Sequence, residues 1–249
     1  MENKEKKVGQ EKESGKGKTW KNKILLALSV LLMITAIFMI FNKQITGMVV
    51  DNMTEKTLTK PAGENYKESI EKAKKEKDVS FEFDDVQEIS LGQVLKAQMD
   101  KNKPNSIGIV SVPEVNMQLP IMYGVSNKVL SIGAGTMKEN MPMGKRNYVL
   151  AGHNVRNEVS LFSPLTLAKV GMKAYVTDYE KVYEYKIDKR YIVQPTQVDV
   201  INDHKEKNEL TLITCIEKGT KRLITHANLV SVYNIDDAPK GAFHEEKKK

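Results

Sequence analysis

The chain has 249 residues, of which 40% are hydrophobic and 29% charged, and its net charge is +7. This length allows one sizeable domain with appended segments. The excess charge divides into +4 on residues 1–23 and +3 on the remainder, and there is no DNA- or RNA-binding motif, so we expect no nucleic-acid partner. Because Cys215 is the only cysteine, an internal disulfide is excluded and the core alone must stabilise the fold.

Residues 24–41 form the longest apolar segment, eighteen residues without a charge. As a helix this segment would span about 27 Å, close to the thickness of the hydrocarbon core of a bilayer. No small-x-small cleavage site follows it, so it predicts an uncleaved transmembrane anchor; a cleaved signal peptide or a buried soluble helix is the alternative. Residues 1–23 contain eight Lys and four Glu. The positive-inside rule therefore places this tail in the cytoplasm and the chain beyond residue 41 outside the membrane.

Residues 42–79 are polar and rich in Lys and Glu, which predicts a stalk between the membrane and a folded domain. Residues 66–78 are expected to form an exposed helix or to remain part of a flexible stalk. The folded domain is predicted over residues 80–238, followed by a charged tail over residues 239–249.

The folded domain shows many short segments of alternating apolar residues and few helical patterns. A short helix is expected over residues 91–99 and a helical turn over residues 165–170. This texture predicts an all-β sandwich or closed barrel. The expected strands lie near residues 107–109, 115–121, 148–153, 172–176, 183–187, 210–215 and 223–232.

Cys215 and His153 each end an apolar strand-like run, which makes them candidates for a nucleophile and a proton carrier. A cysteine attacks carbonyls as the thiolate and needs a base or cation beside it. His204 and His244 lie in polar segments, whereas His226 shares a strand face with Arg222, and its role is left open. The structural alternatives are a buried small apolar Cys215 and a hydrogen-bonded structural His153.

Arg222 begins an apolar segment seven residues after Cys215, so the two strands are expected to be antiparallel neighbours. A guanidinium beside the sulfur would hold an oxyanion or the substrate backbone; the alternative is an exposed strand charge. One cysteine with scattered histidines does not provide the ligand spacing of a zinc site.

These residues carry a resemblance to a known family. The run TLITC at residues 211–215, with Arg222 downstream, resembles the TLxTC…R signature of sortases. The run LAGHN at residues 150–154 resembles the sortase strand that bears the catalytic His, and GAGTM at residues 133–137 also fits. The resemblance covers about residues 81–235 and is greatest to class A, the housekeeping type, because a second membrane span and a lid motif are absent.

The resemblance implies an eight-stranded sortase-type β-barrel with short helices, preceded by one transmembrane helix, in the cell membrane of a Gram-positive bacterium. It implies a cysteine transpeptidase that cleaves LPXTG-type sorting signals of surface proteins between Thr and Gly. Cys215 would form the thioacyl intermediate, His153 would act as general acid and base, Arg222 would stabilise the oxyanion or position the peptide, and Thr214 would help to build the oxyanion hole. The acceptor would be the amine of a peptidoglycan precursor such as lipid II. The residues that would line the groove for the Leu-Pro end are Ala151, Thr196, Val198, Val200, Ile201 and Ile224.

One departure from some class A members concerns calcium. Those members bind Ca²⁺ through carboxylates in the loops before the His and Cys strands. Here Lys138, Met141 and Lys145 stand where acids would be needed. Since Ca²⁺ requires several oxygen ligands, we expect no metal and calcium-independent activity. Two other functions remain open: a membrane-tethered cysteine protease or amidase with water as the acceptor, and a non-catalytic wall- or lipid-binding barrel.

Overall fold

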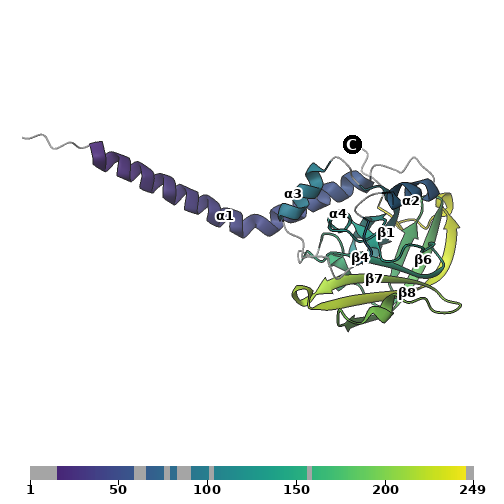
Figure 1. The fold of residues 1–249 in the computed structure, drawn as a ribbon. Coiled ribbons are helices and arrows are strands. Elements are labelled where there is room, and N and C mark those ends of the chain that lie inside the picture. Colours follow the sequence, from purple (N-terminus) through teal and green to yellow (C-terminus); the bar gives the residue numbers. More distant parts are fainter. Residues whose placement is uncertain are drawn as a thin grey trace, which may run out of the picture. The chain divides into compact units, whose positions relative to one another are not determined.

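The computed structural model describes residues 16–58, 66–75, 79–82, 91–100, 104–155 and 159–244 (Figure 1). The chain forms two compact units, Met1–Asn42 and Lys43–Lys249. Helix α1 (Lys16–Leu58) contributes residues to both units, and α2 (Tyr66–Lys74) and α3 (Leu91–Met99) belong to the second unit. Short helices and one-turn 3-10 segments lie between or after the strands: α4 (Asn127–Leu130), η2 (Pro113–Val115), η3 (Ser163–Thr166), η4 (Val198–Ile201), η5 (Glu217–Gly219) and η6 (Ile235–Asp237).

Eight strands close into a barrel in the order β1-β2-β3-β4-β7-β8-β6-β5. The pairs β2–β3 and β4–β7 are parallel, and the other neighbouring pairs are antiparallel. The prediction of an eight-stranded closed barrel with short helices is thereby confirmed. The strands are β1 (Ser106–Val112), β2 (Met117–Met122), β3 (Ala134–Thr136), β4 (Arg146–Gly152), β5 (Lys173–Thr177), β6 (Lys181–Val193), β7 (Asn208–Ile216) and β8 (Lys221–Asn234).

Strand β2 starts two residues later than the apolar alternation predicted. Pro113 fixes the backbone at the start of a 3-10 turn that includes Val115, and Asn116 follows in the left-handed region with φ 56°. The chain reverses there, so β2 begins at Met117 and pairs with β1. Alternation alone cannot show such a turn, because Val115 is apolar and in phase with the strand.

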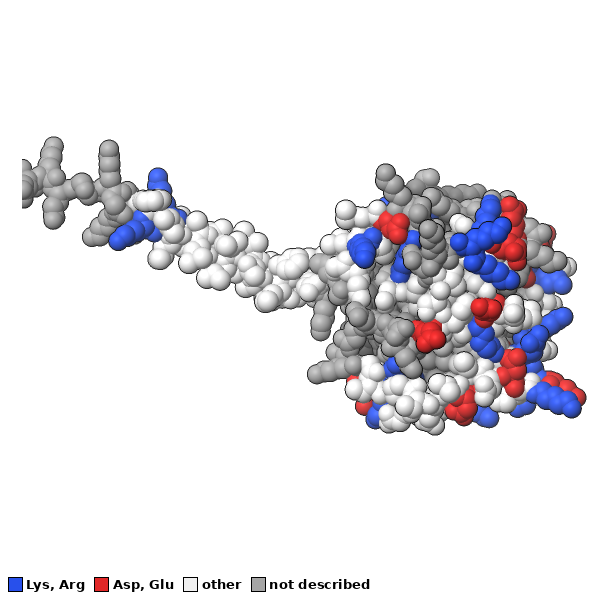
Figure 2. Space-filling view, viewed as in Figure 1, with Lys and Arg blue, Asp and Glu red and all other residues white. Residues whose placement is uncertain are grey.

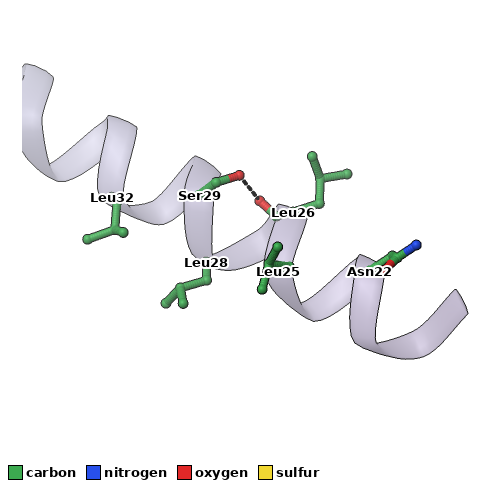
Figure 3. A pocket seen from close by; sticks show the side chains of 6 residues that line it. All are labelled: Asn22, Leu25, Leu26, Leu28, Ser29 and Leu32. Atoms are coloured by element: carbon green, nitrogen blue, oxygen red, sulfur yellow. Dashed lines mark hydrogen bonds between the residues drawn. The ribbon is translucent and has the colours of Figure 1, made fainter. Parts of the chain in front are cut away.

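The apolar length of α1, Trp20–Asn42, has a mean hydropathy of 2.9 and no buried part, so it is long and apolar enough to cross a membrane. Figure 2 shows basic side chains at the N-terminal end of this length and only uncharged described side chains beyond them on the face in view. The Ser29 hydroxyl donates to the carbonyl of Leu26 at 2.8 Å (Figure 3), and Thr35 donates to Leu31 at 2.7 Å. Both polar side chains are thus satisfied within the helix, as a lipid environment requires. The shallow hollow drawn in Figure 3 is formed by six residues of this helix alone: Asn22, Leu25, Leu26, Leu28, Ser29 and Leu32.

The structure differs from the predicted stalk over residues 42–79. Within the second unit, Val50 and Met53 at the end of α1 belong to the barrel's hydrophobic core, with exposed fractions of 0% and 3%. Thr54 donates a hydrogen bond of 2.6 Å to the carbonyl of Ile132. Helix α2 packs near β1 and buries Ala73. The buried side chains of these helices recur every three or four residues, with polar or charged residues between them. The apolar stripe on each helix is therefore too narrow to be recognised from amino-acid composition. Residues 59–65 and 76–78 of the predicted stalk lie outside the described residues.

The predicted charged tail is also partly ordered. Ala242 is 1% exposed and packs in a small cluster with Tyr175 and Val182, beside Phe243. His244 and Gln118 exchange hydrogen bonds, with the amide of His244 donating at 2.6 Å. The end of the chain is thus attached to β2 and β5, while residues 245–249 lie outside the described part.

Candidate active site

Strands β4 and β7 bring the two predicted reactive residues to one end of the barrel. They run parallel with Gly152 opposite Thr214, so His153 and Cys215 each follow the last residue of this register. Apart from their first residues, both strands are buried along nearly their whole length, as is typical of parallel strands covered on both faces. The parallel arrangement therefore places the imidazole and the thiol at the same barrel edge.

Thr214 locks these two strands together at that edge. Its side chain is fully buried, and its hydroxyl donates a hydrogen bond of 2.7 Å to the carbonyl of Gly152. The proton on this hydroxyl is thus engaged within the barrel. In this conformation the Thr214 side chain holds the backbone between His153 and Cys215 and does not direct its proton to an oxyanion.

His153 is 6% exposed and occupies a site in which burial disfavours the charged imidazolium. Burial lowers the pKa of His153 to about 4, from the ordinary value of 6.5. The ring is therefore neutral near pH 7 and able to accept a proton. The backbone is fixed as well, because the carbonyl of His153 accepts a hydrogen bond of 3.0 Å from the amide of Phe162.

Arg222 lies directly opposite Cys215 on the antiparallel strand β8. The predicted neighbouring arrangement of these strands is confirmed (Figure 1). Directly opposed residues have Cβ atoms about 4.5–5.5 Å apart, so the guanidinium is within reach of groups bound at the sulfur. Arg222 donates to the carbonyl of Gly219 at 2.8 Å, which holds the side chain at the η5 turn. Cys215 is partly exposed, as a nucleophile that meets substrate must be.

A cavity of about 270 Å³ lies beside Arg222. Four of the six residues predicted for the groove line it: Val198, Val200, Ile201 and Ile224. The other two lie elsewhere: Ala151 is fully buried in the barrel, and Thr196 is exposed between β6 and η4. The remaining lining residues are Phe81, Glu82, Met137, Val193, Pro195, Gln197, Ile213 and Arg222.

Sequence reasoning missed the contribution of Phe81 and Glu82 to this cavity. Phe81 packs edge-to-face on Tyr123, with ring centroids 5.2 Å apart, and the carbonyl of Ser80 accepts the amide of Val125 at 2.7 Å. Gly124 has φ +79°, and a Cβ there would lie 2.8 Å from the Ser80 carbonyl. A glycine before Val125 is the signal that a second chain segment approaches closely at this turn.

His226 belongs to a different part of β8. It lies opposite Thr211, four residues along the strand from the Cys215–Arg222 pair, which corresponds to about 13 Å. Its two ring nitrogens face Asp188 and Glu209, and Glu209 also contacts His204 at 2.6 Å. His226 and His204 thus form a carboxylate–imidazole cluster that joins β6, β7 and β8 away from the thiol.

The loop before β4, where some class A members bind calcium, carries Lys138 here. Lys138 Nζ lies 2.6 Å from Asp203 Oδ1 and donates to the carbonyl of Ile201 at 2.9 Å. Burial raises the pKa of Asp203, but the hydrogen bond and charge of Lys138 outweigh this effect and lower it overall. Among the described residues there is no group of three or more His, Cys, Asp or Glu placed to hold a metal ion. The ammonium group of Lys138 joins the loop before β4 to the segment that lines the cavity.

Comparisons with known proteins agree with this geometry. A family model described as the sortase domain matches residues 110–230. Sortase A of Streptococcus agalactiae is 42% identical over 208 residues, which cover 81% of this chain and 83% of that protein. Sortase A of Listeria monocytogenes is 35% identical over 205 residues, covering 81% of this chain and 90% of that protein.

Solved structures give the same result for the fold. The crystal structure of Listeria monocytogenes sortase A superposes with a TM-score of 0.51 at 36% identity, over 55% of this chain and 93% of that one. Sortase C-3 of Streptococcus pneumoniae shares the fold, with a TM-score of 0.52 at 22% identity. The curated relatives named here are class A enzymes by name, in agreement with the class A resemblance. On this evidence, the chain belongs to the sortase family.

Proposed function

We propose that this protein is a membrane-anchored cysteine transpeptidase that cleaves LPXTG-type sorting signals between Thr and Gly and transfers the surface protein to a peptidoglycan-precursor amine such as lipid II. The observation that carries the proposal is the placement of Cys215 opposite Arg222, at the barrel end that also bears His153. The names of the sortase A relatives support the same reaction class.

The first half of the reaction requires one proton transfer in each direction. Because burial keeps His153 neutral, the imidazole accepts the proton of the Cys215 thiol as sulfur attacks the Thr carbonyl carbon. The C–N bond to Gly then breaks, and the imidazolium gives its proton to the leaving amine. The products are a thioester on Cys215, a free Gly amine and a neutral imidazole.

The second half reverses these steps with a new amine. The acceptor nitrogen attacks the thioester carbonyl, and His153 takes the proton that this nitrogen loses. The C–S bond breaks, and the imidazolium returns its proton to the sulfur. In both halves the negative charge that develops on the carbonyl oxygen lies near the Arg222 guanidinium, which stabilises it.

The cavity beside Arg222 suits the apolar start of the sorting signal. Val198, Val200, Ile201 and Ile224 provide contact for the Leu and Pro side chains, whose burial is favourable by about 25 cal/mol per Å². We assign these four residues to the peptide groove. Ala151, which is buried in the barrel, and Thr196, which is exposed between β6 and η4, do not line this cavity, and their part in the groove stays a prediction.

The apolar length of α1 supports a single membrane span with the basic tail in the cytoplasm and the barrel outside. Residues 24–41 would then be the anchor. Lys138 supports the proposal that no calcium is required, because its ammonium group already neutralises Asp203 at 2.6 Å. No cofactor takes part in the proposed reaction.

The test uses the full chain in detergent, an LPETG-containing peptide and triglycine, with products read by mass spectrometry. A product in which the Thr carbonyl is joined to triglycine, absent with Cys215→Ala, is the expected result. Cleavage that yields only the free Thr acid would favour a hydrolase. If no reaction occurs and iodoacetamide leaves Cys215 unmodified, the non-catalytic barrel becomes the better interpretation.

A further inference from the structure

The last turns of α1 contact the loop that follows His153. Within the second unit, Val50 and Met53 pack into the barrel core, and Thr54 is bonded to the carbonyl of Ile132. On the same part of the helix, Asp51 Oδ1 accepts a hydrogen bond of 2.7 Å from the hydroxyl of Ser160. Apolar packing therefore seats this helical segment, and the Asp51–Ser160 bond ties it to the loop.

The described residues on the two sides of this loop, 153–155 and 159–163, are joined to each other. Asn154 and Leu161 form an antiparallel bridge, and the amide of Val155 donates to the Ser163 hydroxyl at 2.8 Å. Leu161 has φ 51°, a left-handed backbone that a branched residue adopts only when its surroundings hold it. Ser160, which precedes it, is 1% exposed. A displacement of Ser160 would therefore move the backbone of Leu161. Through the bridge it would also move Asn154, the residue after His153.

A second contact transmits the position of this loop to the backbone before His153. Phe162 is fully buried and lies so close to Gly152 that a Cβ there would be 2.6 Å from the aromatic ring. The amide of Phe162 also donates to the carbonyl of His153. Phe162, two residues after Ser160, therefore contacts the backbone at both Gly152 and His153.

We propose that Asp51 and Ser160 are positioning residues: the end of α1, through their hydrogen bond, holds the loop that sets His153 against Cys215. This inference rests on the proposed role of His153 in proton transfer. An O–H···O⁻ bond of this kind is charge-assisted and roughly twice as strong as a neutral one. The family-model match begins at residue 110, so this support comes from a segment outside the matched domain.

The experiment measures steady-state transpeptidation by the full chain in detergent, with an LPETG peptide and triglycine. Asp51→Ala and Ser160→Ala each remove one partner of the bond and are expected to lower kcat about fivefold, while KM for the peptide changes by less than about twofold. Asp51→Asn keeps an oxygen that accepts the Ser160 proton, so it is expected to retain at least about half of the wild-type kcat.

The matched control is Glu55→Ala, which removes a carboxylate from the exposed surface one helical turn further on and is expected to leave kcat unchanged. Thermal midpoints of all variants are measured, and those of the two alanine variants are expected to stay within about 4 °C of wild type. Wild-type kcat in both Asp51→Ala and Ser160→Ala would overturn the proposal, as would an equal loss in Glu55→Ala or a loss confined to KM. The proposed function is tested separately, by turnover of the wild-type chain that is lost in Cys215→Ala. If the wild-type chain shows no such turnover, both proposals are overturned.

Discussion

The two ends of strand β7 hold their ionisable side chains in opposite ways. At its start, Glu209 is 1% exposed and lies between His204 and His226, with Asp188 on the other nitrogen of His226. At its end, Cys215 is partly exposed beside Arg222, and the neighbouring His153 is kept neutral by burial. Carboxylate–imidazole contacts join three strands at one end, whereas the other end holds a neutral imidazole that can accept a proton. The same strand thus separates the stabilising cluster from the reactive one.

The largest effect is expected from His153→Gln, which keeps a polar side chain but removes the proton carrier. Transpeptidation should fall about 10³-fold in kcat, within the range that general acid–base catalysis supplies. His204→Gln is the control at the other end of the strand, since His204 is half exposed and far from the thiol. Product formation by mass spectrometry measures both. A comparable loss in the two variants would contradict the separation between the two ends.

Next in size is the effect of Glu209→Ala on stability. This substitution removes the carboxylate that His204 and His226 share and leaves His226 with Asp188 alone. Breaking such a buried pair should lower the free energy of unfolding by about 3 kcal/mol, measured by urea titration. The turnover of the folded enzyme should remain near wild type. Glu71→Ala is the control, because its ion pair with Lys74 is exposed and should contribute little.

Arg222→Lys tests the reactive end with the charge preserved. A lysine ammonium is a point charge without the planar fork of guanidinium, so kcat/KM should fall about 10²-fold. The urea midpoint should change little, because Arg222 is not part of the carboxylate–imidazole cluster. Lys221→Ala, one residue earlier, removes a charge paired with Glu217 and should leave kcat/KM close to wild type. If Arg222→Lys retained full activity, a positive charge alone would suffice there, and the planar fork of the guanidinium would not be required.

The sequence predicts the reactive end better than the stabilising end. Cys215, His153 and Arg222 stand in short motifs at strand ends, so their neighbourhood follows from strand order and register. The Glu209 cluster joins residues from β6, β7, β8 and a loop, and its members lie in ordinary polar segments. No local pattern marks a contact that depends on the closure of the whole barrel. For that reason the sequence alone does not assign a role to His226.

The helical segments show a second limit of sequence reasoning. Residues 43–58 are polar in composition, yet Val50 and Met53 reach the core because a helix gathers widely spaced apolar residues on one face. Thr214 shows a similar limit at the site, since its hydroxyl donates to the Gly152 carbonyl only because the fold sets β4 beside β7. In both cases the sequence shows the residues themselves, but the groups that they contact come from another part of the chain.

A smaller effect is expected when pH changes. The folded-state pKa of His153, about 4, lies below the ordinary 6.5, so between these values the unfolded chain binds more protons. This contribution to stability is therefore present at neutral pH and is lost as pH falls through the window. Lowering the pH from about 7 to about 5 should cost wild type about 2 kcal/mol more than His153→Gln, in which the group is absent. Urea titrations of both proteins at the two pH values measure this difference, and an equal pH dependence would show that folding does not lower the pKa of His153.

The smallest effect is expected from calcium. Lys138 already supplies a cation between the loop before β4 and the cavity-lining segment, through Asp203 and the carbonyl of Ile201. Activity of the full chain should therefore be the same in millimolar calcium and in chelator. Lys138→Met keeps the length of the side chain but removes the charge, so Ile201 should be held less firmly and KM for the peptide should rise about threefold. Stimulation of the wild-type enzyme by calcium, reversed by chelation, would show that the lysine does not replace the ion; an unchanged KM in Lys138→Met would show that its bond to Asp203 does not shape the groove.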